Sequence, residues 1–255
     1  RLNRNVINLG LIGHVNRAYE ISSGDLIVAA AGDDVSLPNR VAETVALWNE
    51  HDQLPDFLYF NYRPFGNNPY SYVVDNLHHS LQWQIDRGGA YLKGATAAWT
   101  RRLFDYFGPV RDCSYAEDKA LAFRAALMGG IVCRDIPVIK YRIDSNYIAA
   151  GVALIAARKR ELYLRLGFYE SFEYDLKTLK NRSPERLDEC ERLESKIQDK
   201  KTAIHRELNL FNKSHIKKIV GLYFLAVGLT WTKWPVRKKI SLAKMVVLDM
   251  CGKVR

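Results

Sequence analysis

A short apolar run that ends in two aspartates occupies residues 22–38, SSGDLIVAAAGDDVSLP. Residues 26–31 have the length and composition of a buried strand, and the Gly-Asp-Asp that follows is typical of a loop. Ligands of open α/β sheets bind at the carboxyl ends of the strands, where Asp33 and Asp34 are expected. Two adjacent acids repel each other unless a cation or a hydrogen-bond donor neutralises them. The stretch therefore predicts a Mg²⁺ or Mn²⁺ site, and a solvated turn that caps the next helix is the alternative.

The chain on either side of this stretch alternates strand-like and helix-like segments up to about residue 147. This alternation predicts an α/β fold with a mixed, Rossmann-like sheet flanked by helices. Ser36 is expected to cap a helix that has Pro38 in its first turn. The inner side of that helix is predicted to carry Val41, Val45, Leu47 and Trp48. The other predicted helices are 11–21, one that begins at Thr100, and 116–128, and the predicted strands are 26–31, 57–62, 90–99, 131–136 and 138–143.

Residues 148–255 have a different pattern, because helix formers dominate and no convincing strand is present. Ser183-Pro184-Glu185 is a typical helix start. After it, apolar residues follow a broken heptad-like spacing, which predicts a helical hairpin rather than a long coiled coil. These residues are Cys190, Leu193, Ile197, Ile204, Leu208 and Phe211. The sequence is accordingly divided into a domain of residues 1–147 and a helical region of residues 148–255.

Composition excludes several classes of protein. Apolar residues make up 48% of the chain and charged residues 26%, which is ordinary for a globular protein and rules out disorder and collagen. The four cysteines, at positions 113, 133, 190 and 251, form no Cys-x-x-Cys pair. Their spacing argues against a zinc ribbon or a thiol redox site and is compatible with a reducing compartment.

The charge of the chain is concentrated in its second part. The whole chain carries 38 basic and 28 acidic residues, but residues 1–150 are nearly neutral. Residues 151–255 hold 23 basic and 12 acidic residues. A neutral body with a basic, aromatic-rich tail favours an anionic surface such as a membrane leaflet, and it argues against nucleic acid as a partner.

A second pair of acids, Glu117 and Asp118, stands at the predicted start of a helix. Acids in the first turn of a helix are favoured by the helix dipole, so capping alone would explain them. The functional interpretation is a general base that a rigid element holds against a pocket.

Taken in order, these elements resemble the middle of a family 2 glycosyltransferase with a GT-A fold. The resemblance covers roughly residues 5–147 and none of the tail. The order of the pieces is far more specific than any one of them. In the first half they are Asn8-Leu9-Gly10, Asn16, Ser23-Gly24-Asp25-Leu26-Ile27, Gly32-Asp33-Asp34 and Pro38. In the second half they are Gly94, Arg101-Arg102 before Phe104, Gly108, Glu117-Asp118, Leu121, Arg124, Gly130 and Tyr141-Arg142.

The resemblance implies a role for each matching position. Asp33 and Asp34 match the acids that hold Mg²⁺ or Mn²⁺ and the diphosphate of a nucleotide-sugar donor. Asp118 matches the catalytic base, with Glu117 as its neighbour. Other positions match substrate-binding residues: Gly94, Ala95 and Thr96 under the donor sugar, Arg124 in the acceptor-side half and Arg142 near the domain end. The implied reaction is a single displacement with inversion at the anomeric carbon, of the hexosyltransferase type, in surface polysaccharide biosynthesis.

The sequence also departs from the family pattern. Ala31 stands where the first acid of the Asp-x-Asp element is expected, and Asp144 stands where many members have a His. The strand-loop-strand segment that binds the base and ribose is missing before residue 1, so we expect this chain to be a fragment of a longer transferase. The alternative is a non-catalytic, degenerate transferase domain whose helical tail docks a partner.

The tail contains an apolar stretch, residues 219–231, with lysines on both sides. Its 13 residues span about 20 Å as a helix, which is less than the ~30 Å core of a bilayer. Trp231 and Trp234 beside basic residues fit a membrane interface. We expect a cytoplasmic protein that is peripheral at the inner face of the membrane and acts on a glycan or a lipid-linked acceptor. The alternative for this stretch is a buried helix of a small C-terminal bundle.

Overall fold

The computed structural model describes residues 3–66, 80–89, 92, 94–114, 116–143 and 154–212. The chain forms two compact units. The first comprises Arg1–Tyr147 and Leu164–Lys200, and the second comprises Ile148–Tyr163 and Lys201–Arg255. Residues 164–200 thus belong with the α/β part of the chain, whereas the sequence-based division places them in the helical region.

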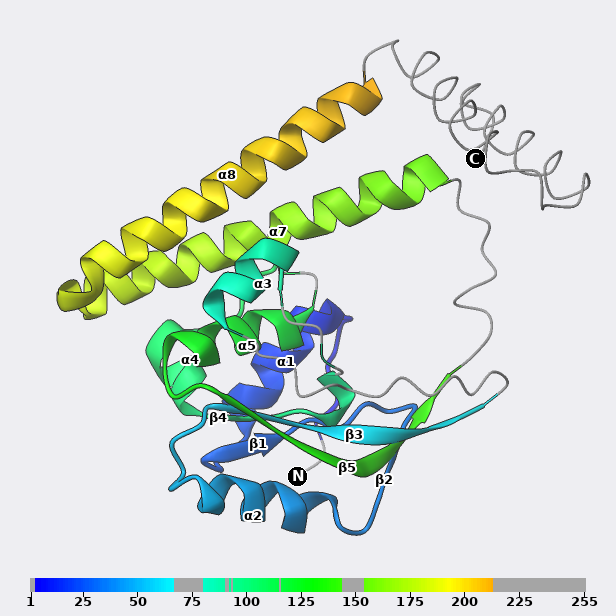
Figure 1. Cartoon of the computed structure of the whole chain (residues 1–255). Helices are drawn as coiled ribbons and strands as arrows, with labels where there is room; N and C mark the ends of the chain where they lie inside the picture. The colour runs from blue at the N-terminus through cyan, green and yellow to red at the C-terminus, as the bar shows by residue number, and fades with distance from the viewer. Residues whose placement is uncertain are drawn as a thin grey trace, which may run out of the picture. The chain divides into compact units, whose positions relative to one another are not determined.

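A mixed five-stranded sheet forms the centre of the first unit, in the order β1-β4-β3-β5-β2 (Figure 1). β3 and β5 are parallel, and the other three pairings are antiparallel. Because β4 is antiparallel to both β1 and β3, the strands β1, β3 and β5 all end at the same edge of the sheet. The strands are β1 (Leu26–Val28), β2 (Val35–Ser36), β3 (Phe57–Phe65), β4 (Ala98–Thr100) and β5 (Ile131–Arg142). This confirms the predicted α/β fold class.

Two strand predictions differ from the structure. Residues 131–136 and 138–143 were expected as separate strands, but β5 continues through Pro137. The register against β3 shifts around Asn61, which absorbs the extra residues as a bulge, and the Asn61 side chain donates to Asp135 Oδ1 at 2.7 Å. Among the described residues of the predicted strand 90–99, Ala98 and Trp99 belong to β4, and Gly94–Thr96 form a 3₁₀ turn, η1, instead.

Helices cover both faces of the sheet (Figure 1). α2 lies on one face, and the other helices before residue 128 lie on the opposite face. Their bounds are α1 (Gly10–Ile21), α2 (Arg40–Glu50), α3 (Leu81–Arg87), α4 (Arg102–Phe107) and α5 (Glu117–Leu127). α5 ends at Gly129-Gly130 as its sequence predicts, and Gly130 has a φ of 91°.

The inner face of α2 differs from the predicted one. Val41 and Val45 are 61% and 42% exposed, and the inward positions are taken by Arg40, Thr44 and Leu47. Ser36 does not cap this helix: it lies in β2, and its hydroxyl accepts a hydrogen bond from Arg40 at 2.9 Å. The prediction is confirmed for Leu47 and for Trp48, which packs against the core, and it is wrong for the two valines because it did not consider a buried arginine on this face.

The central strand β3 is buried on both faces. Its first four residues, Phe57-Leu58-Tyr59-Phe60, are all at most 1% exposed. A nearly continuous apolar run is expected where helices cover both sides of a sheet.

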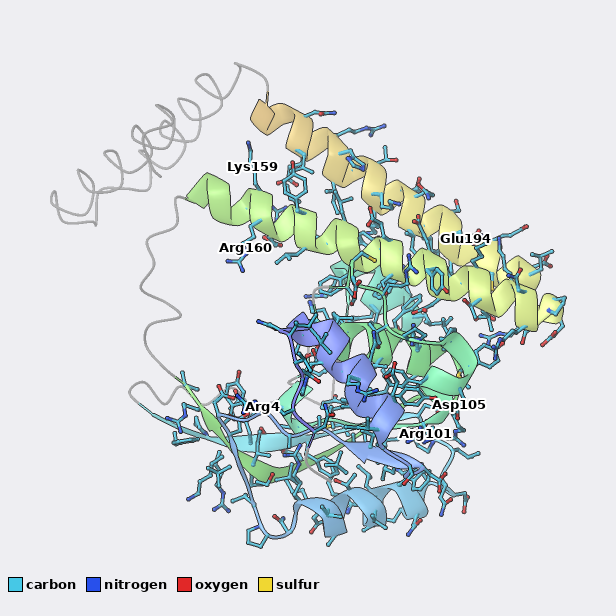
Figure 2. The ribbon with its side chains drawn as sticks, turned by 180° about the vertical axis from the view of Figure 1, so that it is seen from behind. Arg4, Arg101, Asp105, Lys159, Arg160 and Glu194 are labelled. Carbon is cyan, nitrogen blue, oxygen red and sulfur yellow. The ribbon has the colours of Figure 1, made fainter. Side chains whose placement is uncertain are left out.

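Tyr19 of α1 packs against α4. Its ring stacks on Phe104, and its hydroxyl donates to Asp105 at 2.5 Å. The Arg101 guanidinium lies over the Tyr19 ring, and Figure 2 shows Arg101 and Asp105 near each other.

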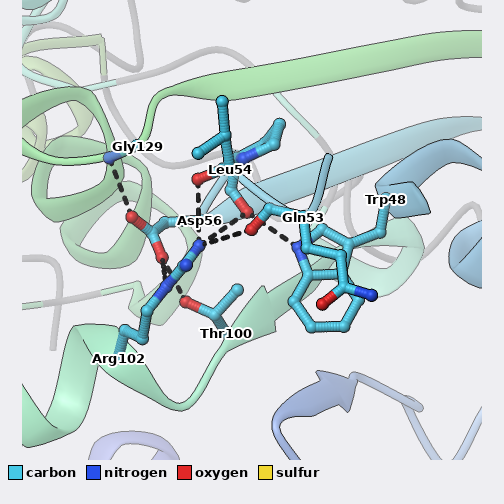
Figure 3. Close-up of polar contacts among 8 residues, drawn as sticks. Trp48, Gln53, Leu54, Asp56, Thr100, Arg102 and Gly129 are labelled. Atoms are coloured by element: carbon cyan, nitrogen blue, oxygen red, sulfur yellow. Dashed lines mark hydrogen bonds and ion pairs between the residues drawn. The ribbon is translucent and has the colours of Figure 1, made fainter. Parts of the chain in front are cut away.

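A polar cluster joins the starts of β3 and β5 (Figure 3). Asp56 accepts hydrogen bonds from Arg102 Nε and from the Gly129 N–H, each at 2.8 Å, and from the Thr100 hydroxyl. Arg102 also donates to the carbonyls of Gln53 and Leu54, each at 2.9 Å. The buried Asp56 carboxylate therefore has several donors, as a buried charge requires.

The predicted helical hairpin is present as α7 (Leu154–Arg182) and α8 (Leu187–Asn212), with a 3₁₀ turn at Pro184–Arg186. In the first unit, Lys180 pairs with Glu194 at 2.6 Å, and Cys190, Leu193 and Ile197 are buried. In the second unit, Arg158 pairs with Glu207 at 2.7 Å, and Ile204 and Leu208 are buried. The side chain of Phe211 lies outside the described residues.

Within the described part of the chain, no helix combines the length and the apolar character that crossing a bilayer requires. The apolar stretch 219–231 and Asp144 lie outside the described residues. Residues 67–79 also lie outside the described residues.

Candidate functional site

The candidate site lies at the edge of the sheet where β1 and β5 end and β4 begins. Three segments lie toward this edge: residues 29–34 after β1, the turn η1 before β4, and Arg142 at the end of β5. Asp118, at the start of α5, is joined to η1 by a hydrogen bond.

Arg142 holds the loop of the two aspartates. Its backbone N–H donates to Asp34 Oδ1 at 2.8 Å, and its Nε donates to the Asp33 carbonyl at 2.9 Å. The guanidinium of Arg142 also lies 5.1 Å from the centre of the Phe65 ring. The structure thus brings together three of the predicted residues, Asp33, Asp34 and Arg142.

The two aspartates differ in their surroundings. Asp33 is exposed, whereas Asp34 is half-buried. Burial raises the pKa of Asp34 above its ordinary value, and the hydrogen bond from Arg142 and the charge of Arg40 act in the opposite direction. Asp34 Oδ2 is buried and has no hydrogen-bond partner among the described residues.

The fit of a divalent ion to the Asp33–Asp34 loop depends on Asp34 Oδ2, which has no hydrogen-bond partner among the described residues. Among the residues that the structure describes, no three His, Cys, Asp or Glu side chains gather as a metal site. Mg²⁺ is commonly held by one or two carboxylates together with phosphate oxygens and water, so a complete protein cage is not required. Asp33 and Asp34 fit such an ion when a phosphate supplies the remaining ligands.

Asp118 is held at the amino end of α5 by two backbone donors. The Gly94 N–H donates to its Oδ2 at 3.1 Å, and the Lys119 N–H donates to its Oδ1 at 2.7 Å. Burial raises the pKa of Asp118 to about 6, with a smaller contribution from the charge of Glu117, and burial also raises the pKa of Glu117. A carboxyl with this pKa is ionised at neutral pH and is a stronger base than an ordinary aspartate.

The three predicted residues of the turn η1 have different surroundings. A Cβ on Gly94 would lie 3.0 Å from Asp118 Oδ2, so a larger residue there would require the Asp118 side chain to shift by a few tenths of an ångström. Ala95 presents its carbonyl to Arg40. Thr96 is 1% exposed, and its hydroxyl accepts from the Phe60 N–H at 3.3 Å. The expected contact between the Thr96 side chain and a donor sugar is therefore wrong, because that side chain is in the core.

The expected substrate contact of Arg124 is also wrong. Its side chain is 0% exposed and pairs with Asp175 of α7, also 0% exposed, at 3.0 Å. Its remaining donors bind the carbonyls of Gly108 and Pro109 at 2.7 and 3.1 Å. Arg124 fixes α7 to α5 and has no surface that a substrate can reach.

Arg40 is the residue that the sequence analysis missed. It is 4% exposed, and its guanidinium donates to the carbonyls of Ala29 and Ala95 and to the Ser36 hydroxyl. Its position seven residues before Leu47, on the buried face of α2, is the signal that was available.

No protein-family model and no curated protein matches this chain. Among solved structures, the chain is similar to S. aureus TarS 1–349 in complex with UDP-GlcNAc, with 14% identity and a TM-score of 0.47 over 80% of this chain and 56% of that chain. For a second structure of S. aureus TarS 1–349, the identity and TM-score are the same, over 80% of this chain and 54% of that chain. With the complex of TarS 1–349 and UDP, the identity is 13% and the TM-score 0.43, over 79% of this chain and 51% of that chain. The chain thus spans little more than half the length of the structures it matches.

Proposed function

We propose that this chain is part of an inverting, nucleotide-sugar-dependent glycosyltransferase of the hexosyltransferase type, in family 2, acting in surface polysaccharide biosynthesis. The observation that supports the proposal is the placement of two acidic elements toward the same edge of the sheet. The Asp33–Asp34 loop follows β1, and Asp118 is bound to the turn that leads into β4. A transferase of this class needs a group for the diphosphate and a base for the acceptor, and these elements supply one of each.

Asp118 performs the proton transfer in this proposal. Its carboxylate takes the proton of an acceptor hydroxyl while the hydroxyl oxygen forms a bond to the anomeric carbon of the donor sugar. The bond from that carbon to the nucleoside diphosphate breaks in the same displacement, so the configuration inverts. The Gly94 and Lys119 N–H groups hold the two carboxylate oxygens in place, and Glu117 is the neighbouring acid.

Asp33 and Asp34 would hold a Mg²⁺ or Mn²⁺ ion through their carboxylates. When bound, that ion would neutralise charge that develops on the departing diphosphate. Arg142 keeps the loop of the two aspartates closed on the end of β5, which presents the unpaired Asp34 Oδ2 in a fixed position.

Release of nucleoside diphosphate from a panel of nucleotide sugars tests this proposal. With Mg²⁺ or Mn²⁺ present, D118N should lower the turnover of the full chain about 10²- to 10⁴-fold, as expected for loss of a general base. D199N, at an exposed aspartate of α8, is the matched control and should leave turnover unchanged. If the chain binds none of the donors and releases no diphosphate, the alternative of a non-catalytic, partner-docking domain is favoured.

The basic tail supports a second part of the proposal, a peripheral position at the cytoplasmic face of a membrane with a lipid-linked or glycan acceptor. From residue 211 onward the chain carries ten basic residues and one acid. The full chain should sediment with vesicles that contain phosphatidylglycerol and stay in solution with phosphatidylcholine vesicles, and binding should weaken as salt is added. Equal binding to both kinds of vesicle would contradict the electrostatic part of this proposal.

A further inference from the structure

Arg40 places a positive charge in the interior of the α/β unit. The residue is 4% exposed, and burial lowers the pKa of its guanidinium, with the charge of Asp34 acting in the opposite direction. The hydrogen bonds of Arg40 go to two main-chain carbonyls and a hydroxyl rather than to a carboxylate. Burying a charge in this way is costly, because neutral acceptors replace water only in part. An apolar residue at this position would fill the same face of α2 without that cost.

The two carbonyls belong to the two halves of the candidate site. The Ala29 carbonyl is in the segment that leads from β1 to Asp33 and Asp34. The Ala95 carbonyl, 2.7 Å from Arg40, is in the turn η1. One guanidinium nitrogen, Nη2, donates to both carbonyls, so the two segments are fixed to the same atom.

The next residue in the turn connects this contact to the proposed base. Gly94 directly precedes Ala95, and its N–H is the donor that holds Asp118 Oδ2. Gly94 also accepts a hydrogen bond from the Ala97 N–H at 2.9 Å, which closes the turn. A movement of the Ala95 carbonyl would therefore move the donor that orients Asp118.

We propose that Arg40 is a positioning residue, which holds the Asp33–Asp34 loop and the turn under Asp118 in a fixed relation to each other. This inference rests on the proposed function, because it assigns the two segments to the donor and to the base. Arg40 touches neither reacting group and acts through the Ala29 and Ala95 carbonyls.

The chain offers a matched control for this role in Arg102. Like Arg40, Arg102 fixes main-chain carbonyls, those of Gln53 and Leu54, but it does so at the opposite edge of the sheet. R102M removes the bonds to these carbonyls and also the ion pair with Asp56, whereas R40M removes three bonds to neutral acceptors. R102M therefore reports what a general loss of stability does to the site.

The experiment measures the carboxyl titration of Asp118 by carbon NMR in the full chain, with D118N identifying the resonance. Among the described residues, the charged groups that act on Asp118 are Glu117 and Lys119, and neither variant alters them. R40M should weaken the Gly94 hydrogen bond and raise the pKa of Asp118 by about half a unit. R102M should leave that titration unchanged, and R40K, which keeps the charge and one of the two carbonyl contacts, should give a smaller shift.

Turnover gives a second readout. R40M should lower kcat about 10- to 100-fold, with its acid limb following the shifted titration, and R40K should restore part of the rate. If R40M does not fold, R40K carries the test, since it keeps the charge and loses one of the two carbonyl contacts. An unchanged titration in R40M, or in R40K where it replaces R40M, overturns the inference, and so does an equal shift in R102M. Because the titration needs no donor, it tests this inference separately from turnover, so a failure of the inference and a failure of the proposed function are distinguishable.

Discussion

Burial changes the acid–base behaviour of Asp118, and this has a consequence for activity. Its pKa is raised to about 6, so the base form is lost as the pH falls through that value. We expect kcat/KM for diphosphate release to be constant above about pH 7 and to fall tenfold per pH unit below about pH 6. A profile that stays flat down to pH 5 would exclude Asp118 as the base.

The same shift predicts the effect of D118N on stability. The folded chain holds the Asp118 proton more tightly than the unfolded chain, where the ordinary pKa of 3.8 applies. The contribution of this group to the free energy of unfolding is therefore complete below about pH 4 and lost as the pH rises through about 6. D118N removes a buried charge and should stabilise the chain at pH 8 by about 1 kcal/mol, a value reduced for the partial exposure of the residue.

Urea unfolding at two pH values checks this expectation. The increase in the free energy of unfolding of D118N over wild type should be present at pH 8 and absent at pH 4, where the Asp118 carboxyl of the folded wild-type chain is itself neutral. A variant that is less stable than wild type at pH 8 would show that the bonds from Gly94 and Lys119 outweigh desolvation.

Gly129 is required by the polar cluster around Asp56. A Cβ there would lie 1.9 Å from the Leu54 carbonyl and 2.7 Å from Asp56 Oδ2. G129A should therefore destabilise the chain by about 2–4 kcal/mol in urea unfolding, the range of a buried clash that breaks a hydrogen-bonded cluster. G32A is the control, since a Cβ at Gly32 meets no atom within 4 Å, and it should change stability by less than about 0.5 kcal/mol. Similar effects of the two variants would contradict this account of Gly129.

At the scale of elements, the Arg124–Asp175 pair joins α5, which carries Asp118, to α7. Both side chains are 0% exposed, so D175A leaves an uncompensated buried cation. We expect a loss of about 3–5 kcal/mol for D175A, and a smaller loss for the double variant R124M/D175L, which removes both charges. Chemical denaturation of the two variants is the measurement, and a double variant less stable than D175A would show that the pair contributes more than charge neutralisation.

The elements that the sequence predicts well have signals of their own. The helix at 116–128 has acids at its start and glycines at its end, and the structure places α5 at Glu117–Leu127. Residues 26–31 form an apolar run, and the structure places the strand β1, which pairs with β4, at residues 26–28 of that run. Ser183-Pro184-Glu185 marks the start of the second helix of the hairpin, and the structure agrees.

The elements that the sequence predicts poorly depend on partners far along the chain. β5 crosses Pro137 because β3 accommodates a register shift there, and periodicity within 131–143 contains no sign of it. Arg40 occupies a core position because carbonyls from residues 29 and 95 receive it. Arg124 resembles a substrate-binding residue in sequence, but its partner is Asp175, outside the segment that carries the resemblance. Of the candidate site, Arg142 contacts Asp33 and Asp34, and Gly94 contacts Asp118, while their catalytic roles stay predictions.

At the scale of the whole molecule, the α/β unit includes a piece of the helical hairpin. Phe172 of α7 stacks on Phe123 of α5 with ring centres 3.8 Å apart, and Tyr169 donates to the Ile85 carbonyl at 2.7 Å. All four residues are 0% exposed. Residues 164–200 are therefore part of the core of this unit, although the sequence-based boundary at 147 excludes them.

Two truncated chains test this assignment. Residues 1–147 alone would expose Phe123 and leave Arg124 without Asp175, so this fragment should lack a cooperative thermal transition and should bind a dye for exposed apolar surface. Residues 1–212 retain these contacts of the first unit and should unfold cooperatively, near the temperature of the same transition in the full chain. Circular dichroism in the near ultraviolet follows both transitions. Cooperative unfolding of residues 1–147 at the temperature seen for 1–212 would mean that α7 covers the sheet unit without stabilising it, and the boundary at 147 would then be the correct one.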